Sequence, residues 1–440
     1  FALVAILLYA NTVNHGYVLD DHAVILQNRF TTEGLAGLGG ILTQDTSAGI
    51  RGPHQILDRG RYRPLSLVSF ALEWQFFPGN PRVGHVGNAL LYALIAWLLF
   101  RVVWKLTRGH LGCVFATTAL FVVHPVHTEV VANIKGRDEL LSALLFLIAI
   151  SCFGSQESGA DEENAAGPPP GPDASAPPRS RPDGGAPARI ALIGGIAAFG
   201  FALLSKETAV LFPLLLAAGM WFAGKSVRAS LRIFLLLSGM AAIFLLWRFA
   251  LVGRGAESMD PLNNPFYAVP FGQKLATIAV IQMRYLGLLL WPRTLSYDYS
   301  IRQIPPRSLD DPLVWLSLLL LGGLLLLTLD GIRRRALYGY GLLIYVAAIT
   351  PVSNLLVNVG APMGERFLFL PSLGFLLALT DLARRGAKKL RQLGAWESPA
   401  QQVTIVAGAL VVLLSLLGSG RTIARNRDWA TNETLFLADV

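Results

Sequence analysis

Two adjacent carboxylates and a histidine stand just beyond the first apolar run of the chain, in "YVLDDHAVILQN" (residues 17–28). Asp20 and Asp21 lie side by side and His22 follows them. Two carboxylates close together raise the pKa of one of them, which suits an acid or base near neutral pH. Aspartate is also favoured at a helix start, so one of the two could instead cap a helix that begins near His22. Both interpretations can hold together, with the other aspartate facing a cavity.

Further charged and polar side chains stand at the ends of apolar runs that are distant in the chain. They are Arg61, Arg63, His124, His127, Glu129, Lys135, Arg137, Asp138, Glu139, Lys206, Glu207, Arg284, Asp298, Glu365 and Arg366. A charge near the apolar centre of a bilayer costs about 2.5–3.5 kcal/mol, so such residues are functional candidates. Together they suit a cavity that binds an anionic headgroup and performs acid–base chemistry beside it.

Five basic residues of this set are candidates for contacts with phosphate. They are Arg63, Arg137, Lys206, Arg284 and Arg366. Guanidinium forks and ammonium groups bind phosphate oxygens, and five cations exceed what ion pairing requires. The alternative is internal ion pairing, of Lys206 with Glu207 at a hairpin and of Arg366 with Glu365.

The stretch "HPVHTE" places His124 and His127 three residues apart, with Glu129 two further on. This spacing invites a zinc site, but the HExxH pattern is absent, Pro125 disrupts regular helix and no third ligand is evident. We therefore expect two histidines that form hydrogen bonds in a polar cavity.

The composition places these residues in a membrane protein. The 440-residue chain is 53% hydrophobic and 15% charged, with a mean hydropathy of +0.51. Soluble domains carry about 25% charged residues, and apolar runs of about 17–22 residues are long enough to cross a bilayer. The sequence predicts an all-α polytopic membrane protein. Its net charge of +9 belongs in cytoplasmic loops and does not indicate nucleic-acid binding.

The pattern predicts about eleven membrane crossings. Their ranges are 1–13, 83–104, 112–123, 137–153, 188–204, 207–223, 229–251, 313–329, 337–353, 366–382 and 403–419. A further segment, 272–291, holds Lys274, Gln282 and Arg284, so we expect an interfacial or re-entrant helix there, with a lipid groove beside it. The basic clusters at 101–108, 225–228, 333–335 and 384–391 belong on the cytoplasmic side. This orientation places the N-terminus inside, the C-terminus outside and the candidate residues on the external face.

The crossings divide the chain into four parts. Residues 1–153 form an N-terminal membrane part, whose first external loop, 14–82, contains short helices. Residues 154–187 are rich in proline, glycine, alanine and serine and read as a disordered cytoplasmic linker. Residues 188–420 form a C-terminal membrane part, and 421–440 an external segment.

Seven motifs in order resemble a known family. They are "YVLDDHAVILQN", "YRPLS", "HPVHTEVVANIKGRDELL", "LLSKETAVLFP", "LLLWPRTLSYDYS", "GERFLFLPSLGF" and "NRDWATNETLF". They resemble the membrane region of the transmembrane and tetratricopeptide-repeat-containing proteins, O-mannosyltransferases of the GT-C superfamily, and of their bacterial relatives. The resemblance runs from about residue 9 to the end, interrupted by the linker.

The resemblance implies a GT-C fold and an enzyme that takes a sugar from a polyprenyl-phosphate carrier. The sugar, mannose in the family, passes to serine or threonine hydroxyls of a protein on the extracytoplasmic side. An acidic residue of the first external loop acts as base, which matches Asp20 or Asp21; we favour Asp20 as base and Asp21 as cap. In the family a tetratricopeptide array follows the last crossing, so 421–440 corresponds to its start. The composition suggests a bacterial inner membrane, with the site facing the periplasm.

The other site residues take supporting roles on this interpretation. For the donor phosphate we expect Arg63, Lys206 and Arg366, with Arg137 next. For positioning the sugar or the acceptor we expect His124, His127, Glu129 and Glu365. A divalent ion, Mg²⁺ or Mn²⁺, would bind at Asp20 and Asp21 if one is used, although we favour a reaction without metal.

Two other functions fit parts of the pattern. A GT-C transferase that modifies lipid or cell-envelope glycan would have the same charged face. A transporter of lipid or sugar would show inverted repeats and charges near the bilayer midplane, and the sequence shows no such repeats. A transferase acting on protein, surrounded by membrane lipids, is therefore the function the sequence favours.

Overall fold

The computed structural model describes residues 1–50, 61–154, 185–253, 264–299, 303–392 and 400–439. Over these residues the chain forms helices, and an isolated β-bridge joins Asn28 to Ile50. The predicted all-α architecture is confirmed. Most of the predicted linker, 154–187, lies outside the described residues.

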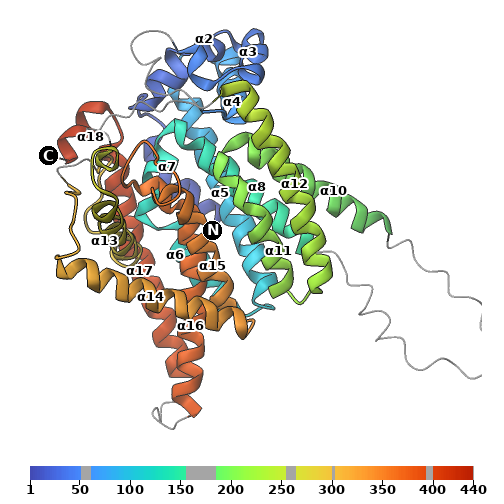
Figure 1. Cartoon of the computed structure of the whole chain (residues 1–440), viewed down its shortest axis with the longest axis vertical. Helices are drawn as coiled ribbons and strands as arrows, with labels where there is room; N and C mark the ends of the chain where they lie inside the picture. Colours follow the sequence, from blue (N-terminus) through green and yellow to red (C-terminus); the bar gives the residue numbers. More distant parts are fainter. Residues whose placement is uncertain (51–60, 155–184, 254–263, 300–302, 393–399, 440) are drawn as a thin grey trace, which may run out of the picture.

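Most of the described α-helices form a bundle, and the remaining four cover one of its ends (Figure 1). The bundle contains α1 (Ala2–Tyr9), α5 (Pro81–Leu106), α6 (Leu111–Val122), α7 (Thr128–Ala132), α8 (Arg137–Gly154), α10 (Gly185–Ser205), α11 (Phe212–Phe222), α12 (Val227–Val252), α13 (Phe271–Leu290), α14 (Pro312–Arg333), α15 (Leu337–Ile349), α16 (Phe369–Gln392) and α17 (Ala400–Asp428). The short helices at the covered end are α2 (Arg29–Thr32), α3 (Leu38–Thr43), α4 (Pro64–Phe76) and α18 (Asn432–Asp439).

Helices occupy all eleven predicted crossings, but the count of eleven is not confirmed. Six of the described helices are long and apolar enough to cross a membrane, or seven if the bent pair Leu111–Val122 and Pro125–Ala132 is one span. The others fall short for physical reasons. Helices α1, α11 and α15 have 8, 11 and 13 residues, and α8 begins with three charges. The predicted interfacial segment forms α13, which is not among the six.

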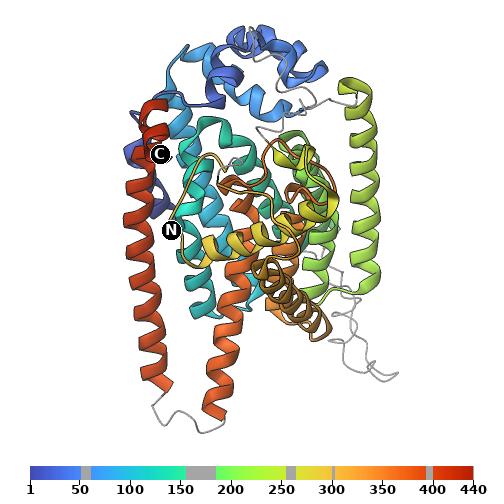
Figure 2. The same cartoon turned by 60° about the vertical axis from the view of Figure 1, so that its left-hand side comes forward.

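The two ends of the bundle differ in character. In both views the connection between α11 and α12, the C-terminal end of α16 and the start of α17 lie at the end opposite α2–α4 (Figures 1 and 2). The basic clusters at 225–228 and 384–391 lie at this end, far from the short helices, as the predicted orientation requires. Helix α14 lies at a steep angle to α17 (Figure 1).

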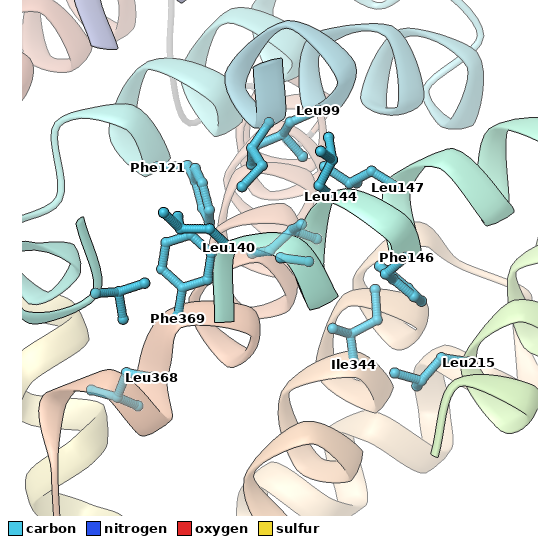
Figure 3. Close-up of a cluster of buried hydrophobic side chains, with 14 of the residues drawn as sticks. Leu99, Phe121, Leu140, Leu144, Phe146, Leu147, Leu215, Ile344, Leu368 and Phe369 are labelled. Carbon is cyan, nitrogen blue, oxygen red and sulfur yellow. The ribbon is translucent and has the colours of Figure 1, made fainter. Parts of the chain in front are cut away.

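The core of the bundle is centred on α8. Leu140, Leu144 and Leu147 of this helix are buried among side chains from α5, α6, α11, α15 and α16 (Figure 3). Dispersion contacts between such side chains, together with polar contacts, hold helices together where lipid replaces water. The charged start of α8 is thereby fixed at the end of the bundle that the short helices cover.

Helices α15 and α16 approach so closely that only glycine fits between them. A Cβ atom on Gly374 would lie 2.4 Å from the carbonyl oxygen of Gly341, and one on Gly341 would lie 2.5 Å from that of Gly374. Small residues allow this kind of backbone approach between helices in membranes.

Replacing Gly374 by alanine should therefore destabilise the bundle by about 1–3 kcal/mol, the usual cost of overpacking. Gly386 of α16 is the matched control, because a Cβ there meets nothing within 4 Å. Gly386→Ala should be neutral or stabilising, since alanine is the better helix former. Thermal unfolding of the purified protein measures both changes, and equal melting temperatures would contradict the close packing.

Candidate functional site

The predicted first external loop forms the layer of short helices, and its aspartate pair faces the start of α8. The short helix η2 (His22–Leu26) begins directly after Asp21. A second short helix, η7 (Ile134–Gly136), leads into α8. The charged residues of the two segments meet between these elements.

Asp21 is fully buried and has a structural role. Its two carboxylate oxygens accept hydrogen bonds from the backbone N–H groups of Val18, at 3.1 Å, and Lys135, at 2.7 Å. Its side chain makes no capping bond to η2, so the prediction that it caps the helix beginning near His22 is wrong. Asp21 instead satisfies an N–H group of η7, 114 residues away, and so joins the loop to the start of α8.

Asp20 is oriented differently, with its side chain 52% exposed. The ammonium group of Lys135 lies 3.3 Å from its carboxylate. This charge lowers the pKa of Asp20 to about 2, helped by Arg61 and Arg366 nearby. By contrast, burial raises the pKa of Asp21 to about 7. The pKa values of these two adjacent aspartates are therefore shifted in opposite directions.

The cations Arg63 and Lys206 are joined to the start of α8. Arg63 contacts Asp138, at 2.5 Å between Nη1 and Oδ2, and Glu207, at 3.0 Å between Nε and Oε2. Lys206 forms an ion pair with Glu139. The alternative pairing of Lys206 with its neighbour Glu207 is therefore wrong, because the two side chains have different main partners.

Arg366 and Glu365 also have separate partners, so their expected mutual pairing is wrong. Glu129 accepts from Nη1 of Arg366 at 2.5 Å and from its backbone N–H at 2.8 Å. Glu365 is buried and accepts from the N–H of Ser296 and from the hydroxyl of Tyr299. Among the described contacts only Nη1 of the Arg366 guanidinium is used for an ion pair, and its side chain is 36% exposed.

Arg137 is held by the protein on all sides. Its guanidinium donates to Asn88, Ser69, Glu73 and the carbonyl oxygen of Gly84, and the residue is 2% exposed. The geometry favours a structural role for this residue, and its predicted phosphate contact stays a prediction.

The four cations that we expect to bind phosphate do not outnumber their acidic partners. Carboxylates pair with Arg63, Arg137, Lys206 and Arg366. The expectation of an excess of cations is wrong for these four, because each reaches an acid that is distant in sequence. Arg284 donates to the backbone oxygen of Gln303.

The histidines form hydrogen bonds, as expected, but in the protein interior. His127 is fully buried, with Tyr92 at its Nδ1 and Ser372 at its Nε2. His124 contacts the backbone oxygen of Leu289 through Nε2. Both link helices to one another, and their predicted role in positioning the sugar stays untested.

Two recesses flank the charged cluster. One is lined by Val24, Thr46, Arg61, Arg63, Ser66, Leu67, Phe70, Lys135 and Asp138. The other is lined by Glu139, Ser142, Ala143, Lys206, Thr208, Leu211, Phe212, Leu215, Ala348, Val352, Phe367, Leu370 and Pro371. The second is polar at the Glu139–Lys206 end and apolar elsewhere, between α8, α11, α15 and α16.

Lys135 was among the charged candidates, but no specific role could be assigned to it from the sequence. It lines a recess, and it contacts the exposed aspartate through its side chain and the buried aspartate through its backbone. A signal was present, since "NIKGRDE" places a lysine two residues before a buried helix with an unusually charged start.

The aspartate pair does not fit a divalent ion. Both oxygens of Asp21 accept backbone N–H groups, and the Asp20 carboxylate faces an ammonium group. Among the described residues no group of three or more His, Cys, Asp or Glu side chains could hold a metal. Mg²⁺ prefers several oxygen ligands, so we derive no step through a metal.

Known proteins are similar to this chain over nearly its whole length. Protein O-mannosyl-transferase TMTC4 of Mus musculus is 28% identical over 98% of this chain and 60% of its own. Protein O-mannosyl-transferase Tmtc1 of Drosophila melanogaster and TMTC1 of Homo sapiens are each 27% identical, over 98% and 99% of this chain. The resemblance seen in the motifs is confirmed. The chain spans about half the length of these curated relatives, from 50% to 60%.

The chain was also compared with protein-family models and with solved structures. No protein-family model matches the chain. A crystal structure of ArnT from Cupriavidus metallidurans bound to undecaprenyl phosphate is similar over 99% of this chain and 74% of its own, at 13% identity and a TM-score of 0.39. That overall similarity is weak.

The raised pKa of Asp21 predicts how stability changes with pH. Because the folded-state pKa of about 7 lies above the ordinary value, the folded protein binds this proton more tightly than the unfolded chain. The contribution of Asp21 to stability is full below about pH 4 and is lost as the pH rises through 7. We expect melting temperatures between pH 5 and 8 to fall with pH, and Asp21→Asn to flatten this slope.

Asp20→Asn is the control for that experiment, because the pKa of Asp20 lies near 2, below the measured range. It should leave the slope between pH 5 and 8 unchanged. An equal slope in wild type and Asp21→Asn would show that Asp21 does not carry the effect.

Proposed function

We propose that the chain is a glycosyltransferase that moves a sugar from a polyprenyl-phosphate carrier to serine or threonine hydroxyls of a protein. Mannose is the sugar that the names of the curated relatives support. The observation that carries the proposal is the half-exposed carboxylate of Asp20 paired with Lys135, which lines a recess together with Arg61 and Arg63. A GT-C fold, with the α2–α4 end facing the extracytoplasmic side, accords with this assignment.

The recess at Glu139 and Lys206 suits both the phosphate and the hydrocarbon of the donor. Lys206 and Glu139 form its polar end, and apolar side chains of α11 and α16 line the remainder. A phosphate at Lys206 with its hydrocarbon among these side chains satisfies both parts. This position lies away from α13, where the sequence suggested a lipid groove, since no residue of α13 lines the recess.

Arg366 is the second phosphate contact in this proposal. Its guanidinium has donor capacity beyond the Nη1 bond to Glu129, and it acts electrostatically on Asp20. Arg63 supports the site indirectly by orienting Asp138 and Glu207. Charge-assisted bonds of this kind strengthen as charge develops on the leaving phosphate.

The reaction is a single displacement in which negative charge moves from the base to the phosphate. The acceptor oxygen forms a bond to the anomeric carbon while the bond from that carbon to the phosphate oxygen breaks. Asp20 takes the hydroxyl proton and becomes neutral, and the phosphate leaves with one additional negative charge. Lys135 contacts Asp20 and also acts electrostatically on Asp138. The leaving group requires no acid.

Removing the base should abolish transfer without unfolding the protein. General bases contribute about 10²–10⁴-fold, so Asp20→Asn should lower kcat by at least about 100-fold. The assay uses protein in lipid nanodiscs, radiolabelled undecaprenyl- or dolichyl-phosphate mannose and a peptide rich in serine and threonine. The melting temperature of Asp20→Asn should match that of wild type, and full activity in this variant would refute the proposed role of Asp20.

The pH dependence of kcat/KM distinguishes the two aspartates as the base. A base must be deprotonated, and kcat/KM reports the pKa of the free enzyme. With Asp20 as base, at a pKa of about 2, kcat/KM should stay level from pH 8 down to pH 5. With Asp21 as base, at about 7, it should fall about tenfold per pH unit below 7. Observing that fall would reassign the base to Asp21.

A further inference from the structure

The short helix α18 reaches the residues that precede the aspartate pair. Oδ1 of Asn432 accepts a hydrogen bond from the N–H of Leu19 at 2.8 Å, across 413 residues of sequence. Beside it, the carbonyl oxygen of Ala430 accepts from the N–H of Gly16 at 3.1 Å. Leu19 is the residue directly before Asp20, so α18 holds the backbone from which the candidate base projects.

The bond from Asn432 is made to a residue in an unfavourable conformation. Leu19 has a φ of +47°, the left-handed region that leucine avoids because its Cβ atom crowds the backbone. Such a conformation persists only where surrounding contacts enforce it. Packing supplies part of this enforcement, since Leu19 lies against a buried cluster that contains Val18, Trp429 and Leu435.

The far end of α18 holds the second half of the site. Oδ2 of Asp439 accepts from the hydroxyl of Ser296 at 2.6 Å and from the N–H of Tyr297 at 2.8 Å. The N–H of Ser296 donates in turn to Glu365 at 2.5 Å. Glu365 immediately precedes Arg366, the proposed phosphate contact.

The two anchors lie on one face of the helix. Asn432 and Asp439 are seven residues apart, which is about two turns and about 10 Å of helix. Leu435 lies on the same face and is fully buried, and the Phe436 ring contacts the Tyr297 ring at 5.3 Å between centroids. Figures 1 and 2 place α18 at the end of the molecule that carries α2–α4.

We propose that α18 is a clasp that fixes Asp20 relative to Arg366, with Asn432 and Asp439 as positioning residues. Neither residue touches a reacting atom. Asn432 sets the backbone before the base, and Asp439 sets the loop that supports the phosphate contact. The inference rests on the proposed transferase function for its catalytic consequence, although the clasp itself is a structural arrangement that can be measured separately.

Asn432→Ala tests the clasp through two independent measurements. Misplacement of a reacting group by about 1 Å costs up to about 100-fold in rate, so kcat should fall about tenfold to 100-fold with KM for the donor within about twofold. Hydrogen exchange followed by mass spectrometry should show faster exchange of the Leu19 amide, in peptides covering residues 16–22. This second measurement does not depend on catalysis.

Three further variants separate positioning from general damage to the helix. Asn432→Asp keeps the acceptor oxygen and should retain both the rate and the slow exchange. Glu433→Ala changes the exposed neighbouring residue and should leave both unchanged. Leu19→Gly in the Asn432→Ala background should restore part of the rate, because glycine adopts positive φ without strain. Asp439→Asn tests the second anchor if Asn432→Ala does not fold.

The rate and the Leu19 amide exchange together test the clasp and the proposed function separately. Loss of rate together with faster Leu19 exchange, rescued by Asn432→Asp, supports the clasp. Unchanged Leu19 exchange in Asn432→Ala overturns it, whatever the rate. If the wild-type protein transfers no sugar, the proposed function fails, while hydrogen exchange still reports whether α18 holds residues 16–22.

Discussion

Charges inside a helical membrane bundle must be paired. The first three residues of α8 are all charged, so each of them requires a partner of opposite charge. Successive residues of a helix point about 100° apart, so Arg137, Asp138 and Glu139 face three directions. They meet Glu73, Arg63 and Lys206, respectively. These partners come from α4, from the residue before α4 and from the residue after α10. One helix start therefore determines how three other segments are placed, and the candidate site forms among them.

The aspartate pair shows how neighbouring residues acquire separate roles. Asp21 is buried and saturated by backbone donors, so it is part of the scaffold. Asp20 keeps half of its side chain exposed and forms an ion pair with the ammonium group of Lys135. Lys135 binds Asp21 through its backbone and Asp20 through its side chain, so the structural aspartate and the proposed base share one supporting residue. The sequence favoured Asp20 as the base, and the exposure of its side chain agrees with that choice.

Much of the architecture was predictable because apolar runs of membrane helices are visible in the sequence. All eleven predicted ranges are helical, and residues from the ends of distant runs do gather at one end of the bundle. Pairing was not predictable. Lys206 precedes Glu207 but binds Glu139, and Arg366 follows Glu365 but binds Glu129. Ion-pair partners depend on how helices pack, and adjacent residues of a short helix point in different directions. The length and tilt of each span also depend on packing, which is why counting runs did not give the number of crossings.

The contact between Asn432 and Leu19 has a consequence for biosynthesis. A ribosome releases the residues around the aspartate pair long before it makes α18, so the loop must wait without the bond that holds its strained residue. During that interval the bundle can insert and pack before the backbone at Leu19 receives its hydrogen bond from Asn432. In the proposed enzyme, Asp20 would be positioned for transfer only after the segment following α17 has been synthesised and has docked.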